Sequence, residues 1–331
     1  MNPLDIHNYK LGSEGFLSMY LDQYQLILGS DLENYAADES LIFNKENPSH
    51  IYFILRRPKV TIDPNSFRNE QNSVKFDFLI HGKEGNDTLN MVAEFPEAKT
   101  PLKLITKYPY NLFEIIDETD ESHLFARPSS LIDHNIILDN VSPAVLDYEI
   151  LYIGQAFGQN GEREAINRLS SHKTLQKISL HSLTENPESD VWILLTKFSQ
   201  VSVLFGLGDD LVDKESYDKD KDLEFVDHFF SNNGFKFSDK QKINLTEAAL
   251  IKYFEPKYNI EFKNNFPKAN HKSYSEYYNL DIRAVNIELD TSELKRKLYT
   301  DKVPRTLRHS KMFELKDDKD RFTLFSFLQP T

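Results

Sequence analysis

One stretch decides the fold of this chain: Tyr148-Glu149-Ile150-Leu151-Tyr152-Ile153-Gly154-Gln155. Its β-branched and aromatic residues favour a strand, and Gly154 permits a close approach or a sharp exit from that strand. A turn at residues 158–161 follows, and then a helix over about 162–172. Val191-Trp192-Ile193-Leu194-Leu195 is expected to form the next strand.

The helix over 162–172 carries two polar residues that suit a phosphate group. Its buried stripe is expected to be Ala165, Ile166 and Leu169. Arg168 and His172 are four positions apart, so they share a face away from the centre of that stripe. Because a guanidinium offers a planar fork of donors, Arg168 is a candidate ligand for phosphate oxygens.

A second informative segment is Thr246-Glu247-Ala248-Ala249-Leu250-Ile251-Lys252-Tyr253-Phe254-Glu255-Pro256-Lys257-Tyr258-Asn259. Asn244 or Thr246 can cap this helix, and Pro256 ends it within a residue or two. Glu247 is then expected in the first turn, where the helix dipole favours the ionised carboxylate. Such a carboxylate is a natural ligand for Mg²⁺, which keeps most of its waters.

These segments together resemble the GIY-YIG nuclease family, and residues 247–259 look very like its excision-repair branch. The resemblance rests on Tyr152-Ile153-Gly154, on Arg168 and His172, and on Glu247 followed by Asn259; it covers about 130 of the 331 residues. It implies an α+β, mixed fold with a small antiparallel sheet flanked by helices. It also implies a metal-dependent endonuclease that hydrolyses phosphodiester bonds in nucleic acid, with DNA rather than RNA as the expected substrate.

The resemblance also implies a role for each residue. Glu247 would hold the divalent ion, Mg²⁺ or Mn²⁺, and Arg168 would stabilise charge on the scissile phosphate. Tyr152 would position or activate the attacking water, and Asn259 would support the site. Arg163 is the alternative to Arg168, because the interval from Tyr152 is longer than the family's.

One family residue is missing from its expected place. The family carries a Tyr, the general base or its relay, about eleven residues before the Tyr of the YIG triplet, and this chain has none there. A hairpin with Leu138 opposite Tyr148 puts His134 opposite Tyr152, and its imidazole, with a pKa of about 6.5, could serve as the base. Tyr148 is the rival, on the same strand face as Tyr152 but about 13 Å along it.

Composition limits the possible classes of protein. Hydrophobic residues make up 40% of the chain and no run of 18 apolar residues occurs, so we expect a globular protein without a membrane span. The absence of cysteine excludes disulfides, thiolate zinc sites and a Cys nucleophile. Without a signal-peptide pattern at the N-terminus, a cytoplasmic location is expected.

The length suggests two or three domains. We expect a strand-rich domain of unknown role over residues 1–130, in which a hairpin joins strands near 74–78 and 89–95. The nuclease-like domain is expected over 131–262. A C-terminal α/β extension is expected over 263–331, with a strand at 282–287.

Charge is unevenly distributed. The net charge of −13 counts against binding nucleic acid by bulk electrostatics. Residues 209–239 hold ten Asp or Glu against four Lys, which predicts a solvated insertion or surface helix, with an autoinhibitory flap as the sharper alternative. Residues 295–311 hold seven Lys or Arg against one Asp. The candidate phosphate contacts of this basic segment are Lys295, Arg296, Lys297, Arg305 and Arg308.

Two functions therefore remain open at the level of sequence. The first is a Mg²⁺-dependent endonuclease whose flanking regions select the substrate. The second is a degenerate module of the same fold that binds nucleic acid or a protein partner without cutting it. Cleavage in the presence of Mg²⁺ or Mn²⁺ distinguishes the two.

Overall fold

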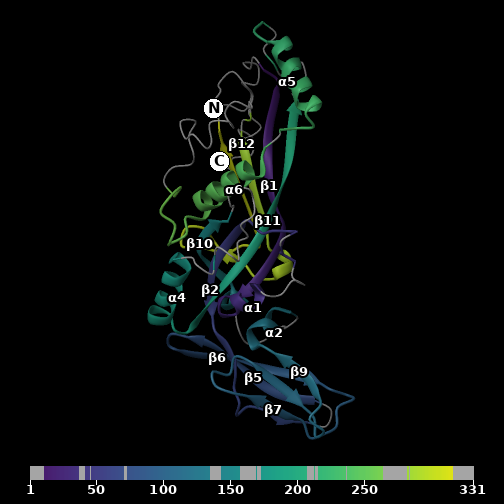
Figure 1. The fold of residues 1–331 in the computed structure, drawn as a ribbon, viewed down its shortest axis with the longest axis vertical. Coiled ribbons are helices and arrows are strands. Elements are labelled where there is room, and N and C mark those ends of the chain that lie inside the picture. The colour runs from purple at the N-terminus through teal and green to yellow at the C-terminus, as the bar shows by residue number, and fades with distance from the viewer. Residues whose placement is uncertain are drawn as a thin grey trace.

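The structure, a computed structural model, describes residues 11–36, 42–44, 46–70, 73–134, 143–156, 169, 173–206, 212, 215–235, 237–263, 282 and 284–315. It confirms a mixed α+β fold. A large curled sheet occupies the upper part of the molecule and a smaller β unit the lower end (Figure 1).

The elements follow one another along the chain in a strand-rich order. The strands are β1 (Ser13–Leu28), β2 (Ile51–Pro58), β3 (Val60–Ile62), β4 (Arg68–Asn69), β5 (Ser73–Gly82), β6 (Gly85–Glu94), β7 (Lys103–Thr106), β8 (Phe113–Ile116), β9 (Ser122–Ala126), β10 (Tyr148–Gln155), β11 (Ser189–Gly206), β12 (Ala284–Asp290), β13 (Leu298–Tyr299) and β14 (Arg308–Glu314). The α-helices are α1 (Leu32–Ala36), α2 (Pro128–His134), α4 (Lys173–Glu185), α5 (Lys219–Ser231) and α6 (Asp239–Phe254). Short 3-10 turns cover Gly29–Asp31, Pro143–Leu146 and Ser292–Leu294.

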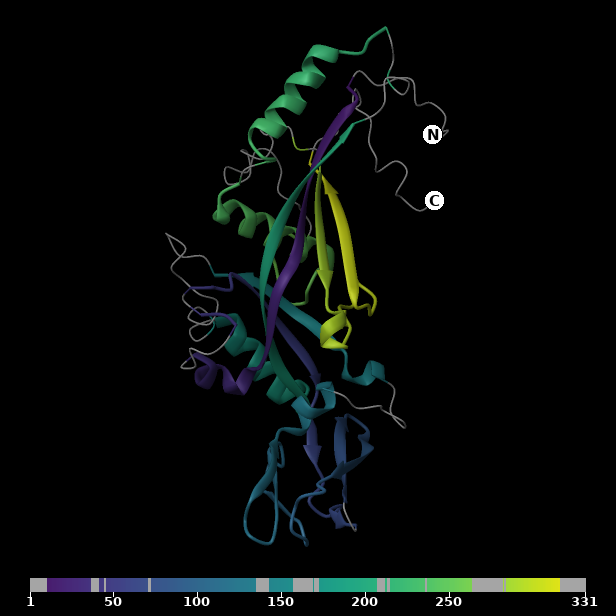
Figure 2. The same ribbon diagram turned by 90° about the vertical axis from the view of Figure 1, so that its right-hand side faces the viewer.

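The large sheet has seven strands in the order β13-β10-β2-β11-β1-β12-β14. The four strands β10, β2, β11 and β1 pair antiparallel in succession, whereas β12 runs parallel to β1 and β13 parallel to β10. Strands β1 and β11 are 16 and 18 residues long and twist around each other as they rise (Figure 2). The strand expected at 191–195 is therefore only the lower part of β11.

Two apolar cores lie on the two faces of this sheet. One face holds Phe53 of β2 and Ile153 of β10 together with the buried side of α6. The other holds Tyr52 of β2 and Leu151 of β10 together with α4. Because side chains alternate along a strand, neighbouring residues of β2 serve different cores, which is why this strand is hydrophobic throughout.

The smaller β unit lies between β2 and β10 in the sequence. The strands β3, β5 and β4, with β6 paired to β5, form one sheet, and β7, β8 and β9 form another. Their shared core includes Phe76, Phe78 and Phe113. The hairpin expected here is confirmed as β5 and β6, which meet at a turn between Gly82 and Gly85.

The domain boundaries expected from the sequence separate strands that belong to one sheet in the structure. Strands β1 and β2, placed in an N-terminal domain ending at 130, pair with β11 and β10. Strands β12 to β14, placed in a C-terminal extension, belong to the same sheet. Sequence reasoning missed this because a composition shift marks a loop but does not say which distant strands pair.

The acidic segment contains α5, which lies at the upper end of the molecule (Figure 1). Asp222 in its first turn is buried and accepts hydrogen bonds from the backbone N–H groups of Gly12 and Ser13, at 2.7 and 3.1 Å. The prediction of a helix within this segment is confirmed, and one of its acidic residues serves to anchor the start of β1.

Candidate active site at the end of strands β2 and β10

Two tyrosines meet where β2 begins and β10 ends. In the antiparallel register of these strands Gly154 pairs with Tyr52, and the ring centroids of Tyr52 and Tyr152 are 6.3 Å apart. Tyr52 is fully buried, whereas Tyr152 is partly exposed. The pair therefore presents one buried and one accessible phenol at the same end of the sheet.

Gly154 leaves the space that these rings occupy. A Cβ at this position would lie 2.7 Å from Cε1 of Tyr152 and 2.7 Å from both Cζ and the hydroxyl oxygen of Tyr52. Any side chain would push both rings away. The glycine that follows Tyr152-Ile153 is thus required by a close approach of two aromatic rings.

The histidine expected opposite Tyr152 is a wrong prediction. Residues 128–134 form helix α2 rather than a strand, and the residue opposite Tyr152 is Ile54 of β2. His134 therefore does not lie on the strand that faces Tyr152. The prediction assumed that the partner strand comes directly before β10, whereas the actual partner precedes the inserted β unit.

Tyr148 is also wrong as the rival for the base. A β-bulge at Leu151 adds one residue to β10, so the pairing passes from Ile150 directly to Tyr152. As a result Tyr148 and Tyr152 lie in different cores. Tyr148 is fully buried, with the Arg57 guanidinium 4.6 Å from its ring centroid.

Tyr52 is a candidate site residue that was not expected from the sequence. It is the second residue of the buried strand β2. The family pattern places the first-strand tyrosine about eleven residues before Tyr152, whereas Tyr52 comes 100 positions before it. The sequence did contain a signal for Tyr52: β2 and β10 are both apolar, and each has a Tyr near the end at which the two strands pair.

Asn259 fixes the backbone of the YIG triplet. Its side-chain Nδ2 donates to the carbonyl of Ile153 at 2.8 Å, and its Oδ1 accepts from the N–H of Ile153 at 2.9 Å. The N–H of Tyr258 donates to the carbonyl of Leu151 at 3.0 Å. Asn259 is buried and acts as an added edge partner of β10, next to Tyr152 in that strand.

Tyr258 adds a further phenol to the face that carries Tyr152. It packs against the same core, and its hydroxyl lies 3.0 Å from Nδ1 of His181 on α4. Burial raises the pKa of Tyr258, and Glu185 raises it further. Its hydroxyl therefore stays protonated at neutral pH and can donate a hydrogen bond to His181.

Glu247 lies in the middle of α6 rather than at its start. The helix begins at Asp239 after the N-cap Ser238, whose side chain forms a capping box with Gln241. The expected caps, Asn244 and Thr246, are internal, so the argument from the helix dipole is wrong for Glu247. The predicted end is confirmed: the helix stops at Phe254, two residues before Pro256.

The helix that carries Glu247 covers the other face of the sheet from the tyrosine pair. It packs against β10, and its apolar residues share a core with Ile153. Glu247 itself retains 9% of its surface. The structure thus joins Tyr152, Tyr52 and Asn259 around β10, and places Glu247 on the helix that covers the opposite face.

Arg168, Arg163 and His172 lie outside the described residues. Leu169, which follows Arg168 in the chain, is described and is 1% exposed. It lies in the core that contains Tyr52 and Leu151. The expected burial of Leu169 is therefore confirmed.

Three arginines of the basic segment make contacts within the protein. Arg296 is a wrong prediction as a phosphate contact, because its side chain is buried and donates to the carbonyl of Ile132 at 2.6 Å. Arg305 lies 3.5 Å from the ring centroid of Tyr299 and 3.6 Å from Asp147, and Arg308 forms an ion pair with Asp290 at 2.9 Å. Lys295 and Lys297 complete the predicted set, and their contact with nucleic acid stays a prediction.

Asp117, Glu121 and His123 form an acidic cluster with metal-ligand spacing in the inserted β unit. One Asp117 oxygen accepts hydrogen bonds from the backbone N–H groups of Thr119 and Glu121 and from the Thr119 hydroxyl. These contacts, the Thr119 hydroxyl first, lower the pKa of Asp117. The geometry is that of a side chain holding a turn between β8 and β9.

A cavity of about 260 Å³ opens beside the first residues of β2. Its lining includes His50, Ile51 of β2, and Ile243 and Thr246 of α6. The His50 carbonyl accepts from the N–H of Ala156 at 2.8 Å, so the cavity lies where β10 ends. Glu247 directly follows Thr246 of its lining.

Comparison of this chain with protein-family models, with curated proteins and with solved structures finds no match. Within the described residues, no helix is long and apolar enough to span a membrane.

Proposed function

We propose that this chain is a metal-dependent endonuclease of the GIY-YIG type, which hydrolyses phosphodiester bonds in nucleic acid, most readily in DNA. The observation that carries the proposal is the juxtaposition of Tyr52 and Tyr152 over Gly154. With Tyr52 in place, both tyrosines of the family pattern have a counterpart in the chain.

The sheet around these tyrosines supports the same proposal. Within the seven strands, β10, β2 and β11 form an antiparallel unit flanked by α4 and α6. In this proposal that unit, part of the seven-stranded sheet, would take the place of the small sheet that the family resemblance implies. The β unit of residues 60–126 is then an insertion into the loop between its first two strands.

The carboxylate of Glu247 fits a hard divalent cation, because Mg²⁺ prefers oxygen ligands and keeps several waters. The two tyrosines lie over the other face of the sheet, so they are not assigned to the ion. Glu247 is not sealed from solvent, since 9% of its surface is exposed. Glu247 would hold the ion, which when bound would polarise the scissile phosphate.

The remaining steps fall to the side chains. The phenol of Tyr152, accessible at the end of β10, would orient the attacking water, and Tyr52 beside it would accept the proton or relay it. Arg168 would neutralise charge that develops on the phosphate oxygens. Through its two hydrogen bonds to Ile153, Asn259 would hold the backbone of Tyr152 and Gly154 in position.

A nicking assay on supercoiled DNA with Mg²⁺ or Mn²⁺ tests the proposal. The parent protein should convert supercoiled to open-circular DNA, and Glu247→Ala should abolish conversion while thermal unfolding stays cooperative. Glu224→Ala, at an exposed position of α5, is the matched control. Equal nicking by Glu247→Ala and the parent would refute the metal assignment, and binding without nicking by the parent would favour a degenerate binding module.

A further inference from the structure

The outer face of the β7–β8–β9 sheet, in the inserted β unit, carries exposed apolar side chains around a hollow. This sheet lies at the lower end of the molecule (Figure 1). Ile105, Tyr108 and Phe125 line a shallow hollow of about 270 Å³ and are 43%, 86% and 65% exposed. Large apolar side chains that gather on one face and stay open to solvent mark a binding surface.

The strand register brings part of this lining into one row. Ile105 of β7 pairs with Glu114 of β8, and Glu114 pairs with Phe125 of β9. Paired residues of neighbouring strands point to the same face of a sheet, and Phe113 and Ile115 of β8 point to the core on the other face. The row therefore holds a carboxylate between an aliphatic and an aromatic side chain.

The loop between β7 and β8 holds Tyr108 at the rim of the hollow. The N–H of Tyr110 donates to the carbonyl of Lys107 at 2.7 Å, and the carbonyl of Tyr110 accepts from the N–H of Ile62 at 2.9 Å. The ring centroids of Tyr108 and Tyr110 are 6.0 Å apart, with the ring planes at 84°. Because the loop is already fixed, a ligand that contacts Tyr108 does not have to order its backbone.

Two lysines flank this row without being neutralised. Lys103 and Ile105 point outward on β7, since Leu104 between them packs against the core. Lys107 lines the hollow. Both lysines are exposed, and among the described residues neither forms an ion pair. Their positions along the strand are about 13 Å apart. The face therefore offers two ammonium groups to the phosphates of a nucleic acid.

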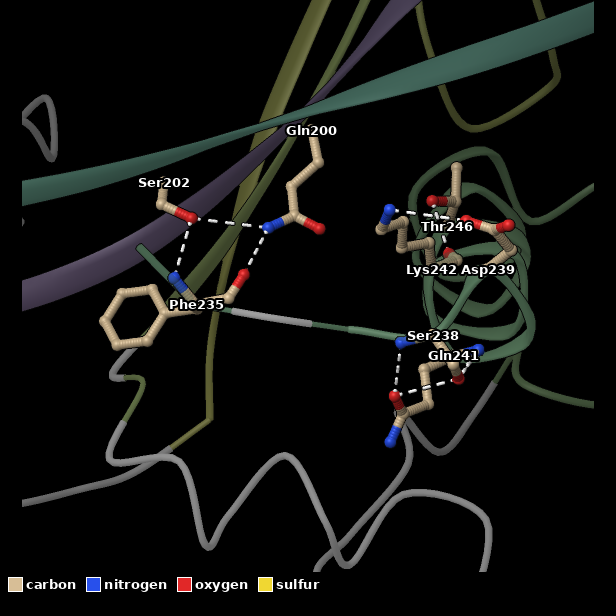
Figure 3. Close-up of polar contacts among 8 residues, drawn as sticks. All are labelled: Gln200, Ser202, Phe235, Ser238, Asp239, Gln241, Lys242 and Thr246. Carbon is tan, nitrogen blue, oxygen red and sulfur yellow. Dashed lines mark hydrogen bonds and ion pairs between the residues drawn. The ribbon is translucent and has the colours of Figure 1, made fainter. Parts of the chain in front are cut away.

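The lysines of the cavity beside α6 are, in contrast, already engaged. Lys242 pairs with Asp239 at 3.3 Å on the same helix, as Figure 3 shows. Lys197 donates to Oδ1 of Asn47 at 2.6 Å. Of these two hollows, the one on the β7–β8–β9 sheet combines exposed aromatic rings with positive charge that is unpaired within the described part of the chain.

Glu114 supplies a hydrogen-bond acceptor in the middle of the row. Its carboxylate lines the hollow and forms no ion pair with any residue that the structure describes. A carboxylate accepts a hydrogen bond from the exocyclic amino group of cytosine, whereas thymine presents a carbonyl and a methyl group there. A base that stacks on Phe125 therefore lies beside an acceptor that favours amino-bearing bases.

We propose that this face binds a single-stranded stretch of the DNA substrate. Lys103 and Lys107 bind its phosphates. Its bases stack on Tyr108 and Phe125, because aromatic side chains beside positive charge bind single strands. Glu114 selects a base that carries an amino group. The proposal rests on the proposed nuclease function and deepens it, since it names a single-stranded stretch as part of the substrate.

This face is distant from the candidate catalytic end of the large sheet. Tyr52 and Pro58 lie near opposite ends of β2, about 20 Å apart, and the inserted unit follows Pro58. The single-stranded stretch is therefore held away from the bond that is cut. For the same reason, its binding can be measured separately from cleavage.

Binding in EDTA tests this face directly. Fluorescence anisotropy gives the Kd of a short labelled oligodeoxycytidine and of an oligodeoxythymidine of equal length. The parent should bind the oligodeoxycytidine more tightly. Phe125→Ala should raise its Kd at least about fivefold through lost stacking. Lys107→Ala should reduce the slope of log affinity against log salt by about 0.7. Glu114→Ala should remove the difference in Kd between the two oligonucleotides.

Matched controls lie elsewhere on the surface. Phe230→Ala, on α5, changes an aromatic side chain that is 66% exposed, and Lys83→Ala changes an exposed lysine of the inserted unit. Both should bind as the parent does. Tyr108→Ala serves as a second variant should Phe125→Ala unfold. Parent-like Kd values for folded Tyr108→Ala and Lys107→Ala would overturn the assignment of this face.

Further outcomes separate this proposal from its alternatives. Binding of the oligodeoxycytidine without any nicking in Mg²⁺ would refute the nuclease and keep this face. Nicking by a parent protein that binds neither oligonucleotide would keep the nuclease, overturn this proposal and leave the face to a protein partner. Deoxycytidine monophosphate should displace the probe only at far higher concentration than the unlabelled oligonucleotide does. Equal displacement would assign the hollow to a free nucleotide and overturn the proposal of a bound strand.

Discussion

Gly154 lies directly opposite Tyr52 in the pairing of β10 with β2, and the Tyr52 hydroxyl occupies the space 2.7 Å from where a Cβ of residue 154 would stand. This relationship connects two parts of the chain that the inserted β unit separates. It explains why a glycine follows Tyr152-Ile153.

Gly154→Ala should destabilise the protein by about 1–3 kcal/mol, because the added methyl displaces two packed rings. It should also lower nicking, since both candidate catalytic tyrosines move. Chemical denaturation and the nicking assay measure the two effects. Gly206→Ala is the matched control, because a Cβ there meets nothing within 4 Å, and it should change stability by less than about 0.5 kcal/mol. A Gly154→Ala protein as stable as the parent would contradict the close approach.

Tyr52→Phe should keep the ring in place and remove only the hydroxyl. If Tyr52 takes part in proton transfer, nicking should fall by about 10²–10⁴-fold. In the pH profile of the residual rate, the change in rate that comes from ionisation of the Tyr52 hydroxyl should be absent. Tyr148→Phe, in the core on the other face of the sheet, should cut at the parent rate once folded. The reverse result, with Tyr148→Phe inactive and Tyr52→Phe active, would overturn the reassignment of the first-strand tyrosine.

Asn259→Ala should remove both hydrogen bonds to Ile153 and leave its N–H and carbonyl without those partners. We expect a loss of about 2–4 kcal/mol in the free energy of unfolding. Asn90→Ala, which removes an exposed hydrogen bond to Asp77, is the comparison and should cost less than about 1 kcal/mol. Urea denaturation measures both. Equal effects at the two positions would show that the contact of Asn259 with β10 is unimportant.

Arg296→Ala should affect stability rather than nucleic-acid binding. The buried guanidinium bonds the Ile132 carbonyl, so its loss should cost about 1–3 kcal/mol. The salt dependence of DNA affinity should remain that of the parent. Arg308→Ala, whose side chain is 79% exposed, should be nearly neutral for stability. A stable Arg296→Ala protein with weakened DNA binding would restore the sequence-based assignment.

His309 should make stability depend on pH. Burial lowers the pKa of His309 to about 4, below the value of about 6.5 expected in the unfolded chain. The unfolded state then binds more protons between these values, so stability is full above about pH 6.5 and falls as the pH drops toward 4. A loss of about 1–3 kcal/mol is expected over this range. Urea denaturation at pH 7 and pH 4.5 should show a smaller drop for His309→Phe; equal drops would exclude His309 as the cause.

Local features were predictable from the sequence, and long-range pairing was not. The alternation near residue 76 and the polar turn after it predicted the hairpin of β5 and β6, and Pro256 predicted the end of α6. The capping box of Ser238 and Gln241 also marks the true start of α6, but that segment was interpreted as part of the acidic stretch. Each of these signals lies within a few residues of the feature that it predicts.

The candidate site depends on two features that carry no local signal. The bulge at Leu151 interrupts the alternation of side chains between the two faces of β10. Counting residues from Tyr152 therefore assigned Tyr148 to the wrong face of the sheet. The pairing of β2 with β10 spans the inserted unit, so proximity in sequence pointed to His134 instead of Tyr52. Asn259, which follows α6 and hydrogen-bonds to Ile153 of β10, was expected near Tyr152 only because of the family resemblance.

The inserted β unit also constrains the order in which the molecule assembles. Pairing β2 with β10 closes a loop of about ninety residues, an entropic cost that grows with the logarithm of loop length. The inserted unit has its own apolar core built from hairpins close in sequence, so it can form early and bring Pro58 and Tyr148 near each other. We expect the central strand pair then to close like a short hairpin, and the candidate catalytic end, with Gly154 opposite Tyr52, lies farthest from the point where this closure starts.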